Sequence, residues 1–201
     1  DDCRLEELAT PLYITATDLV AGELVVQENG CAVSALMASM CLPGVAMPIA
    51  GDDRLLIDGG VLCNLPAEIL RARGADIVIG VDISGRADGN APWTIPKRPG
   101  LMGTLARSLE LMNRKRYEEE CAACDIVIRP DIQGIGFTAF TQVDRLAEAG
   151  YAATERVIGQ LKQMIGARTE SASELDYRGG RLAIPANNLS AGYDAETVVS
   201  I

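Results

Sequence analysis

One run of seven residues, Asp76-Ile77-Val78-Ile79-Gly80-Val81-Asp82, constrains the fold of this chain more than any other feature. Its apolar residues are continuous rather than alternating, which is typical of a strand whose sheet is covered by helices on both faces. The preceding segment, 66–74, is predicted to be a helix, because Pro66 suits a first helical turn and Gly74 suits a helix end. A helix joined to such a strand by two residues is the unit of parallel sheets, so the expected class is α/β.

Other segments carry the patterns of strands and helices on both sides of this unit. Four further strands are predicted, at 12–17, 23–27, 54–57 and 125–128. The first two could pair as a ribbon across a turn at Gly22. Three helices are predicted from apolar residues that recur every three or four positions, at 32–40, 101–121 and 143–165. This order favours a three-layer α/β/α arrangement with helices on both sides of a largely parallel sheet.

The predicted helix at 101–121 has one strongly charged side. Oppositely charged residues recur there four positions apart, which stabilises an exposed helix face by about 0.2–0.5 kcal/mol per pair. The pairs are Glu110–Arg114, Arg114–Glu118, Lys115–Glu119 and Arg116–Glu120. Together with Lys97, Arg98 and Arg107, the basic residues could instead touch anionic lipid headgroups. We favour the solvated helix face over the lipid contact, because the glutamates match the basic residues along it.

The chain divides by character near Gly166. Its 201 residues suit one domain with an appendage, and all the predicted helices and strands above fall within 1–166. Residues 85–99 are rich in glycine and proline and are predicted to be a loop. From 167 to 201 no strong periodicity is found, so this part is predicted to be a tail, with a small strand near 182–184.

The charged residues exclude several classes of function. With 28 acidic and 18 basic side chains the formal charge is −10, which argues against a nucleic-acid partner because phosphate binding needs a basic surface. The chain has no histidine, so it cannot by itself supply a Ser-His-Asp triad, and a metal site would need cysteines and carboxylates alone. Gly134-Ile135-Gly136 lacks the third glycine of a dinucleotide fingerprint. We therefore expect neither a metal nor a cofactor.

The six cysteines are scattered along the chain and form no disulfide framework. Cys121 and Cys124 form the only local pair, and we interpret them as small apolar residues at a helix-to-strand junction rather than as a zinc or redox site. Free thiols are typical of a reducing compartment. No apolar run reaches the about 18–20 residues that span a bilayer, and the first four residues do not resemble a signal peptide. A cytoplasmic location is expected, with membrane association left open.

Asp58-Gly59-Gly60 is the motif that best fits a reactive site. In open α/β sheets, functional groups gather beyond the carboxyl ends of strands, and Asp58 directly follows the predicted strand 54–57. Two glycines after it permit an unusual backbone path and close approach by another segment. An ordinary turn is the competing interpretation, and it is the more frequent one, because Asp-Gly is a common turn dipeptide.

The order of motifs around Asp58 resembles the latter part of patatin-like phospholipases, particularly the bacterial proteins akin to neuropathy target esterase. The segments that carry the resemblance are Ala16-Thr17-Asp18-Leu19, Gly22-Glu23, Ala35 to Val45, Leu56 to Val61, Asn64-Leu65-Pro66, Gly74 to Asp82 and Gly150-Tyr151. Together they cover roughly residues 11–165. The resemblance implies a patatin-like α/β fold, of which 1–166 would be the carboxyl-terminal portion, incomplete at its amino-terminal side.

The resemblance also implies a lipid acyl hydrolase that works with a Ser-Asp dyad and no histidine. In that family the serine lies in a Gly-x-Ser-x-Gly elbow, the aspartate lies in an Asp-Gly-Gly or Asp-Gly-Ala motif, and a glycine-rich loop forms the oxyanion hole. The aspartate carries over to Asp58, with Gly59 and Gly60 completing the motif. Asp58 would take the serine proton as acyl transfer begins. The implied substrate is a phospholipid or lysophospholipid ester.

The sequence departs from this pattern at the nucleophile. None of the serines stands in a Gly-x-Ser-x-Gly motif; Ser190 comes nearest, but Asn188 replaces the first glycine. The glycine-rich loop is also absent, and both parts belong upstream of residue 1 in the family's order. We therefore expect the nucleophile to lie outside this chain, the chain alone to be inactive, and the amino-terminal remainder of the domain to be a partner. A non-catalytic α/β module that binds lipid or protein remains the alternative.

Overall fold

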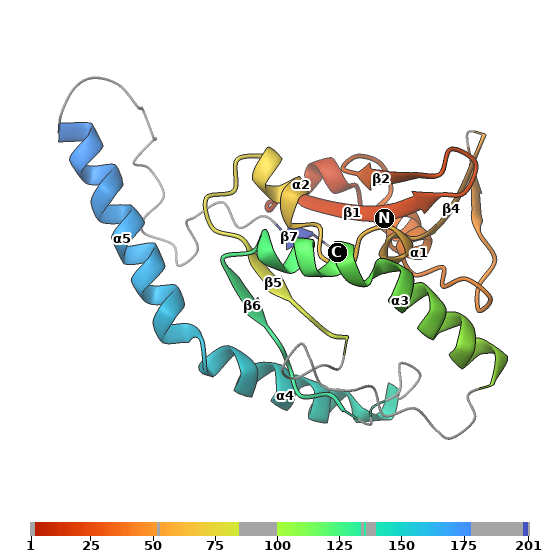
Figure 1. Cartoon of the computed structure of the whole chain (residues 1–201). Helices are drawn as coiled ribbons and strands as arrows, with labels where there is room; N and C mark the ends of the chain where they lie inside the picture. Colours follow the sequence, from red (N-terminus) through yellow and green to blue (C-terminus); the bar gives the residue numbers. More distant parts are fainter. Residues whose placement is uncertain are drawn as a thin grey trace. The chain divides into compact units, whose positions relative to one another are not determined.

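The computed structural model describes residues 3–51, 53–84, 100–133, 135, 140–177 and 199–200 (Figure 1). These residues belong to two compact units. The first unit contains two short 3-10 helices, η1 (Leu5–Glu7) and η2 (Gly59–Val61), the α-helices α1 (Ala32–Ser39), α2 (Ala67–Ala72) and α3 (Leu101–Ala122), and the strands β1 (Leu12–Asp18), β2 (Glu23–Gln27), β3 (Ile49–Gly51), β4 (Arg54–Asp58) and β7 (Val199–Ser200). The combination of sheets and helices confirms the predicted α/β class.

Antiparallel pairing dominates the larger sheet, in which the strand order is β2-β1-β4-β3. All three pairs along this order are antiparallel, and only β7 joins β1 in parallel. The expectation of a largely parallel sheet is wrong for these strands. The connections explain the difference for two of the three pairs, because β1 and β2 are separated by four residues and β3 and β4 by two. Such short links permit hairpins, whereas a parallel pair needs a crossover of a dozen or more residues.

The ribbon predicted for the first two strands is confirmed. Its register pairs Ala16 with Val25 and Asp18 with Glu23. Gly22 takes a positive φ of 71° and donates its N–H to the Asp18 carbonyl at 2.8 Å. A left-handed residue closes this tight turn, and glycine adopts that conformation without the steric cost that a Cβ atom would add.

Helices pack against both faces of β1. Ile14 is fully buried and packs with Leu5 and with the alanines of α1, among them Ala32 and Ala35. Tyr13 is the next residue along the strand and therefore points to the opposite face, where it packs against Leu70 and its neighbours on α2. The small side chains of α1 let this helix lie close to β1 and β4.

Strand β5 (Ile79–Val81) is shorter than the run that predicts it, and it pairs in parallel with β6 (Ile126–Ile128). The Asp125 N–H donates to the Val78 carbonyl at 2.9 Å, and the Asp82 N–H donates to the Ile128 carbonyl at 2.8 Å. Val78 is buried, but the side chains of Ile79 and Val81 are 39% and 51% exposed. The continuous apolar run is therefore not covered on both sides within the described residues.

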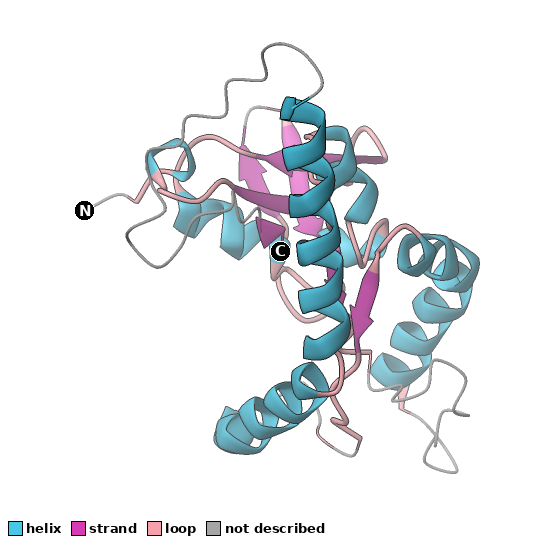
Figure 2. Cartoon of the chain, turned by 90° about the vertical axis from the view of Figure 1, so that its left-hand side faces the viewer, coloured by secondary structure: helices cyan, strands magenta, loops and turns pink. Residues whose placement is uncertain are grey.

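The helices predicted at 32–40, 66–74 and 101–121 are confirmed as α1, α2 and α3. Pro66 is the N-cap of α2 rather than a residue of its first turn. The helix predicted at 143–165 is two helices, α4 (Val143–Glu155) and α5 (Ile158–Tyr177), which point in different directions (Figures 1 and 2). At the break the Thr154 hydroxyl donates to the Gly150 carbonyl at 2.9 Å, and the Val157 N–H bonds to the Thr154 carbonyl in a tighter turn.

The second unit has its own small core. Ile126 and Ile128 of β6 pack with Ala153 of α4. Val157, just before α5, and Leu161 and Met164 of α5 extend this cluster. A further 3-10 helix, η3 (Phe140–Gln142), precedes α4. The boundary expected at Gly166 falls inside α5, because this helix continues to Tyr177. The predicted loop at 85–99 and the predicted strand at 182–184 lie outside the described residues.

Among the described residues, no helix combines enough length with enough apolar character to cross a bilayer.

Candidate functional site

Asp58 is the last residue of β4, and its backbone is held from both sides. The strand pairs Asp58 with Ala16 of β1, and the preceding Ile57 is buried opposite Thr17. The Asp58 N–H donates to the carbonyl of Cys41, just beyond α1, at 3.1 Å. The sequence therefore places the carboxylate at the carboxyl end of a strand, as predicted, although this strand belongs to an antiparallel sheet.

The Asp58 side chain is half-buried and accepts one hydrogen bond, from the Gly60 N–H to Oδ1, at 2.7 Å. Burial raises the pKa of the Asp58 carboxyl above its ordinary value, and the Gly60 N–H partly offsets this effect. Within the described residues no cation pairs with Asp58. A carboxylate with a raised pKa and no cationic partner is a stronger base than an ordinary aspartate, so it is suited to accept a proton.

Gly59 and Gly60 support this arrangement for steric reasons that differ between them. A Cβ atom at Gly59 would lie 2.5 Å from the Thr15 hydroxyl and 2.7 Å from the Thr15 carbonyl oxygen, so no larger residue fits without a backbone shift. A Cβ atom at Gly60 would meet Asn64 Oδ1 at 2.9 Å and Asp58 Oδ1 at 3.1 Å, both of them ends of side chains. Gly59 is thus required by close backbone packing, whereas Gly60 mainly presents its N–H.

Helix α3 holds the segment that follows this turn. The Asn113 amide donates to the Val61 carbonyl at 2.8 Å, and the Arg116 guanidinium donates to the Leu62 carbonyl. Glu120 accepts from the backbone N–H groups of Asn64 and Leu65, at 3.1 Å and 3.0 Å. The sequence patterns do not predict that Asn113, Arg116 and Glu120 contact the segment after Asp58.

Glu120 requires a correction, because the spacing of charges predicts it to lie on an exposed helix face, whereas it is only 9% exposed. The pairs Arg114–Glu118 and Lys115–Glu119 do lie on the solvated side, at 3.1 Å and 3.8 Å. The exposed glutamates and the buried Glu120 all lie four residues after a basic residue, so this spacing does not distinguish them. Only the position of the turn after Asp58 distinguishes the buried one.

All six cysteines are free thiols, in agreement with the interpretation from the sequence. Burial, with the Glu120 carboxylate beside it, raises the pKa of the Cys63 thiol to about 12, and burial also raises the pKa of the Cys124 thiol. Both thiols therefore stay protonated at neutral pH and are poor nucleophiles. The described residues contain no group of three or more side chains that could hold a metal ion.

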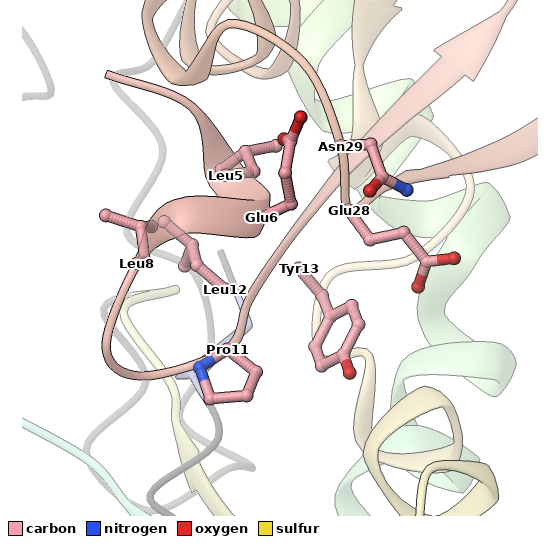
Figure 3. A pocket seen from close by; sticks show the side chains of 8 residues that line it. All are labelled: Leu5, Glu6, Leu8, Pro11, Leu12, Tyr13, Glu28 and Asn29. Carbon is pink, nitrogen blue, oxygen red and sulfur yellow. The ribbon is translucent and has the colours of Figure 1, made fainter.

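A separate open cavity of about 370 Å³ lies beside the start of β1 (Figure 3). It is lined by Leu5, Glu6, Leu8, Pro11, Leu12, Tyr13, Glu28 and Asn29. Its two carboxylates already have partners, because Glu6 accepts from the Gly30 N–H at 2.8 Å and Glu28 pairs with Arg73 at 2.8 Å. Asp58 does not line this cavity, so the cavity is not the site that the motif predicts.

Six residues of the other candidate motifs lie outside the described residues: Lys97, Arg98, Gly134, Gly136, Asn188 and Ser190. Of the basic cluster the described part is Arg107 and 114–116, and there Arg107 pairs with Glu110 at 2.7 Å.

No family model matches the chain. Among curated proteins, it is 28% identical over 173 residues to an uncharacterised NTE family protein of Mycobacterium tuberculosis, covering 77% of this chain and 30% of that protein. It is 30% identical over 172 residues to patatin-like phospholipase domain-containing protein 7 of Rattus norvegicus (75% and 13%), and 26% identical over 186 residues to lysophospholipase nte1 of Aspergillus fumigatus (80% and 12%). The chain thus spans 12–30% of the length of these relatives.

These matches agree with the motifs around Asp58, and the chain is a relative of the patatin-like phospholipases, a family of the hydrolase type. The mycobacterial relative is named as an NTE family protein, so the similarity extends to that group.

Proposed function

We propose that this chain supplies the aspartate of a Ser-Asp dyad in a patatin-like hydrolase of phospholipid or lysophospholipid esters. Asp58 is the proposed base, with Gly59 and Gly60 as its backbone support, and the nucleophilic serine and the oxyanion loop lie outside this chain. The observation that carries the proposal is the half-buried Asp58 carboxylate, held by the Gly60 N–H in an Asp-Gly-Gly turn and raised in pKa by burial.

In the proposed reaction Asp58 accepts the proton of the serine hydroxyl while the serine oxygen attacks the ester carbonyl. As the tetrahedral intermediate collapses, the proton passes from Asp58 to the leaving oxygen, and the acyl group stays on the serine. Asp58 then takes a proton from water, whose oxygen attacks the acyl-serine, and returns it to the serine. Each step needs a carboxylate whose pKa is close enough to neutrality for transfer in both directions, which burial of Asp58 favours.

The proposal includes an amino-terminal remainder that completes a three-layer α/β/α domain, with 1–166 as its carboxyl-terminal portion and 167–201 as a tail. Support comes from α1 and its C-cap Met40, because Val33, Met37 and Met40 lie on one stripe and are 58%, 55% and 71% exposed. Apolar stripes of this kind usually pack against another element. The proposed site of action is the cytoplasm, with peripheral membrane contact through the lipid substrate.

The test is Asp58→Asn in the full-length protein that carries this sequence, assayed on a lysophospholipid and on short acyl esters. Turnover should fall by about 10²–10⁴-fold, because the amide cannot accept the serine proton. Asp53→Asn is the matched control, since Asp53 lies exposed in the turn before β4. Wild-type turnover in a folded Asp58→Asn protein would refute the proposal.

A second candidate is a non-catalytic α/β module that binds lipid or protein, and the absence of a Gly-x-Ser-x-Gly motif from these 201 residues favours it. The full-length polypeptide discriminates between the two. A Gly-x-Ser-x-Gly motif preceded by a glycine-rich loop upstream of residue 1, or a second polypeptide found by mass spectrometry of the purified protein, favours the hydrolase. If both are absent, the binding module is favoured.

A further inference from the structure

The segment after the Asp58 turn depends on a buried charge that comes from a distant part of the chain. Glu120 is only 9% exposed, and its Oε2 atom accepts the N–H groups of both Asn64 and Leu65, at 3.1 Å and 3.0 Å. Hydrogen bonds to an ionised acceptor are roughly twice as strong as those between neutral groups. A carboxylate removed from water needs such partners, so Glu120 and these two N–H groups hold each other in place.

The turn between Asp58 and these N–H groups is short and internally bonded. The Leu62 and Cys63 N–H groups both donate to the Gly59 carbonyl, at 3.0 Å and 2.8 Å. The side chain of Asn64 lies against Gly60, since a Cβ atom at Gly60 would be 2.9 Å from Asn64 Oδ1. A shift of the segment at Asn64 is therefore transmitted to Gly60, whose N–H is the hydrogen-bond donor to Asp58 Oδ1.

We propose that Glu120 is a positioning residue for Asp58: by fixing the Asn64 and Leu65 N–H groups, it keeps the Gly60 N–H directed at the Asp58 carboxylate. This inference rests on the proposed role of Asp58 as the dyad base. Asn113 and Arg116 add donors to the Val61 and Leu62 carbonyls from the same helix. Of these three α3 side chains, Asn113 and Arg116 donate to the segment, whereas Glu120 accepts from its N–H groups.

The test is a set of Glu120 variants in the full-length protein, with kcat expressed per active site titrated to completion with a fluorophosphonate probe. Glu120→Ala should lower kcat by about ten- to a hundredfold at nearly unchanged KM, because the base is misplaced while substrate binding is retained. Glu120→Gln should restore most of kcat, since its amide oxygen can still accept both N–H groups. Glu120→Asp, whose carboxylate is one methylene shorter, should give an intermediate kcat.

Glu118→Ala is the matched control, because Glu118 lies on the exposed side of the same helix and pairs with Arg114; its kcat should stay at the wild-type value. A fall in the number of titrated sites with kcat per site unchanged would make Glu120 a purely structural residue and overturn the inference. If Glu120→Ala does not fold, an unchanged kcat in folded Glu120→Asp overturns it equally. Wild-type activity in Asp58→Asn would instead reject the proposed function, so the two failures are distinguishable.

Discussion

Asp58 in the first unit and Asp82 in the second both lie at the carboxyl end of a strand, Asp58 as the last residue of β4 and Asp82 directly after β5. Each ends an apolar stretch that predicts a strand, and each is followed by a backbone N–H that donates to its Oδ1 atom from two residues further on. The two distances are similar, at 2.7 Å from Gly60 to Asp58 and 2.9 Å from Ser84 to Asp82. Judged by the backbone alone, both aspartates are turn residues of the same kind.

Their side-chain partners are different. Asp82 is only 3% exposed, and its second oxygen accepts from the Arg129 guanidinium at 3.1 Å. Asp58 has no cationic partner within the described residues, and burial raises the pKa of its carboxyl. An aspartate neutralised by arginine holds two strands together, whereas an unpaired one at the same kind of strand end can exchange a proton. The partner, and not the turn, decides the chemistry.

The largest effect on stability is expected from breaking the Asp82 ion pair. Arg129→Met leaves the buried Asp82 carboxylate unpaired and should lower the free energy of unfolding by about 3 kcal/mol. Asp58→Asn removes no ion pair, so it should change the same quantity by less than about 1 kcal/mol. Urea unfolding of both variants measures the difference. Equal losses would mean that Asp58 is as structural as Asp82.

A smaller effect on the free energy of unfolding is expected from replacing either Gly59 or Gly60 by alanine, which adds one methyl group. Gly59→Ala should destabilise the protein by about 1–3 kcal/mol, because the new Cβ meets the backbone of Thr15. Gly60→Ala should lower the free energy of unfolding by less, since only the side-chain ends of Asn64 and Asp58 must move. Thermal unfolding of the two variants side by side tests this order, and a greater loss in Gly60→Ala would contradict it.

The smallest effect concerns the pH dependence of stability. Because burial raises the pKa of Asp58 in the folded state, the folded protein binds more protons than the unfolded chain between the two pKa values. The stability linked to Asp58 is thus fully present below the unfolded pKa of about 3.9, and is lost as pH rises through the folded value. The free energy of unfolding of Asp58→Asn minus that of the wild type should therefore be larger at pH 7 than at pH 3.5. Urea unfolding of both proteins at the two pH values measures this difference. A difference that shrinks as pH rises would argue against a raised pKa.

Much of the secondary structure follows from patterns that are local in the chain. The spacing of apolar residues predicts α1 and α3, Pro66 and Gly74 predict α2, and the turn at Gly22 predicts the β1–β2 ribbon. The order of motifs predicts the relationship to patatin-like proteins. The prediction of one helix from apolar spacing fails at 143–165, where the structure has α4 and α5. The helix expected at 143–165 is interrupted between Glu155 and Ile158, where the Val157 N–H bonds to the Thr154 carbonyl in a tighter turn, and apolar periodicity contains no information on that change.

The sequence by itself determined where Asp58 stands, at the end of a strand and before two glycines, because strand and turn propensities act between neighbouring residues. The tertiary structure alone decided which charges are buried and what they touch. Glu118 and Glu120 share one helix and the same spacing to an arginine, yet one is solvated and the other holds the turn after Asp58. Such contacts join residues more than fifty positions apart, and they depend on how the elements pack.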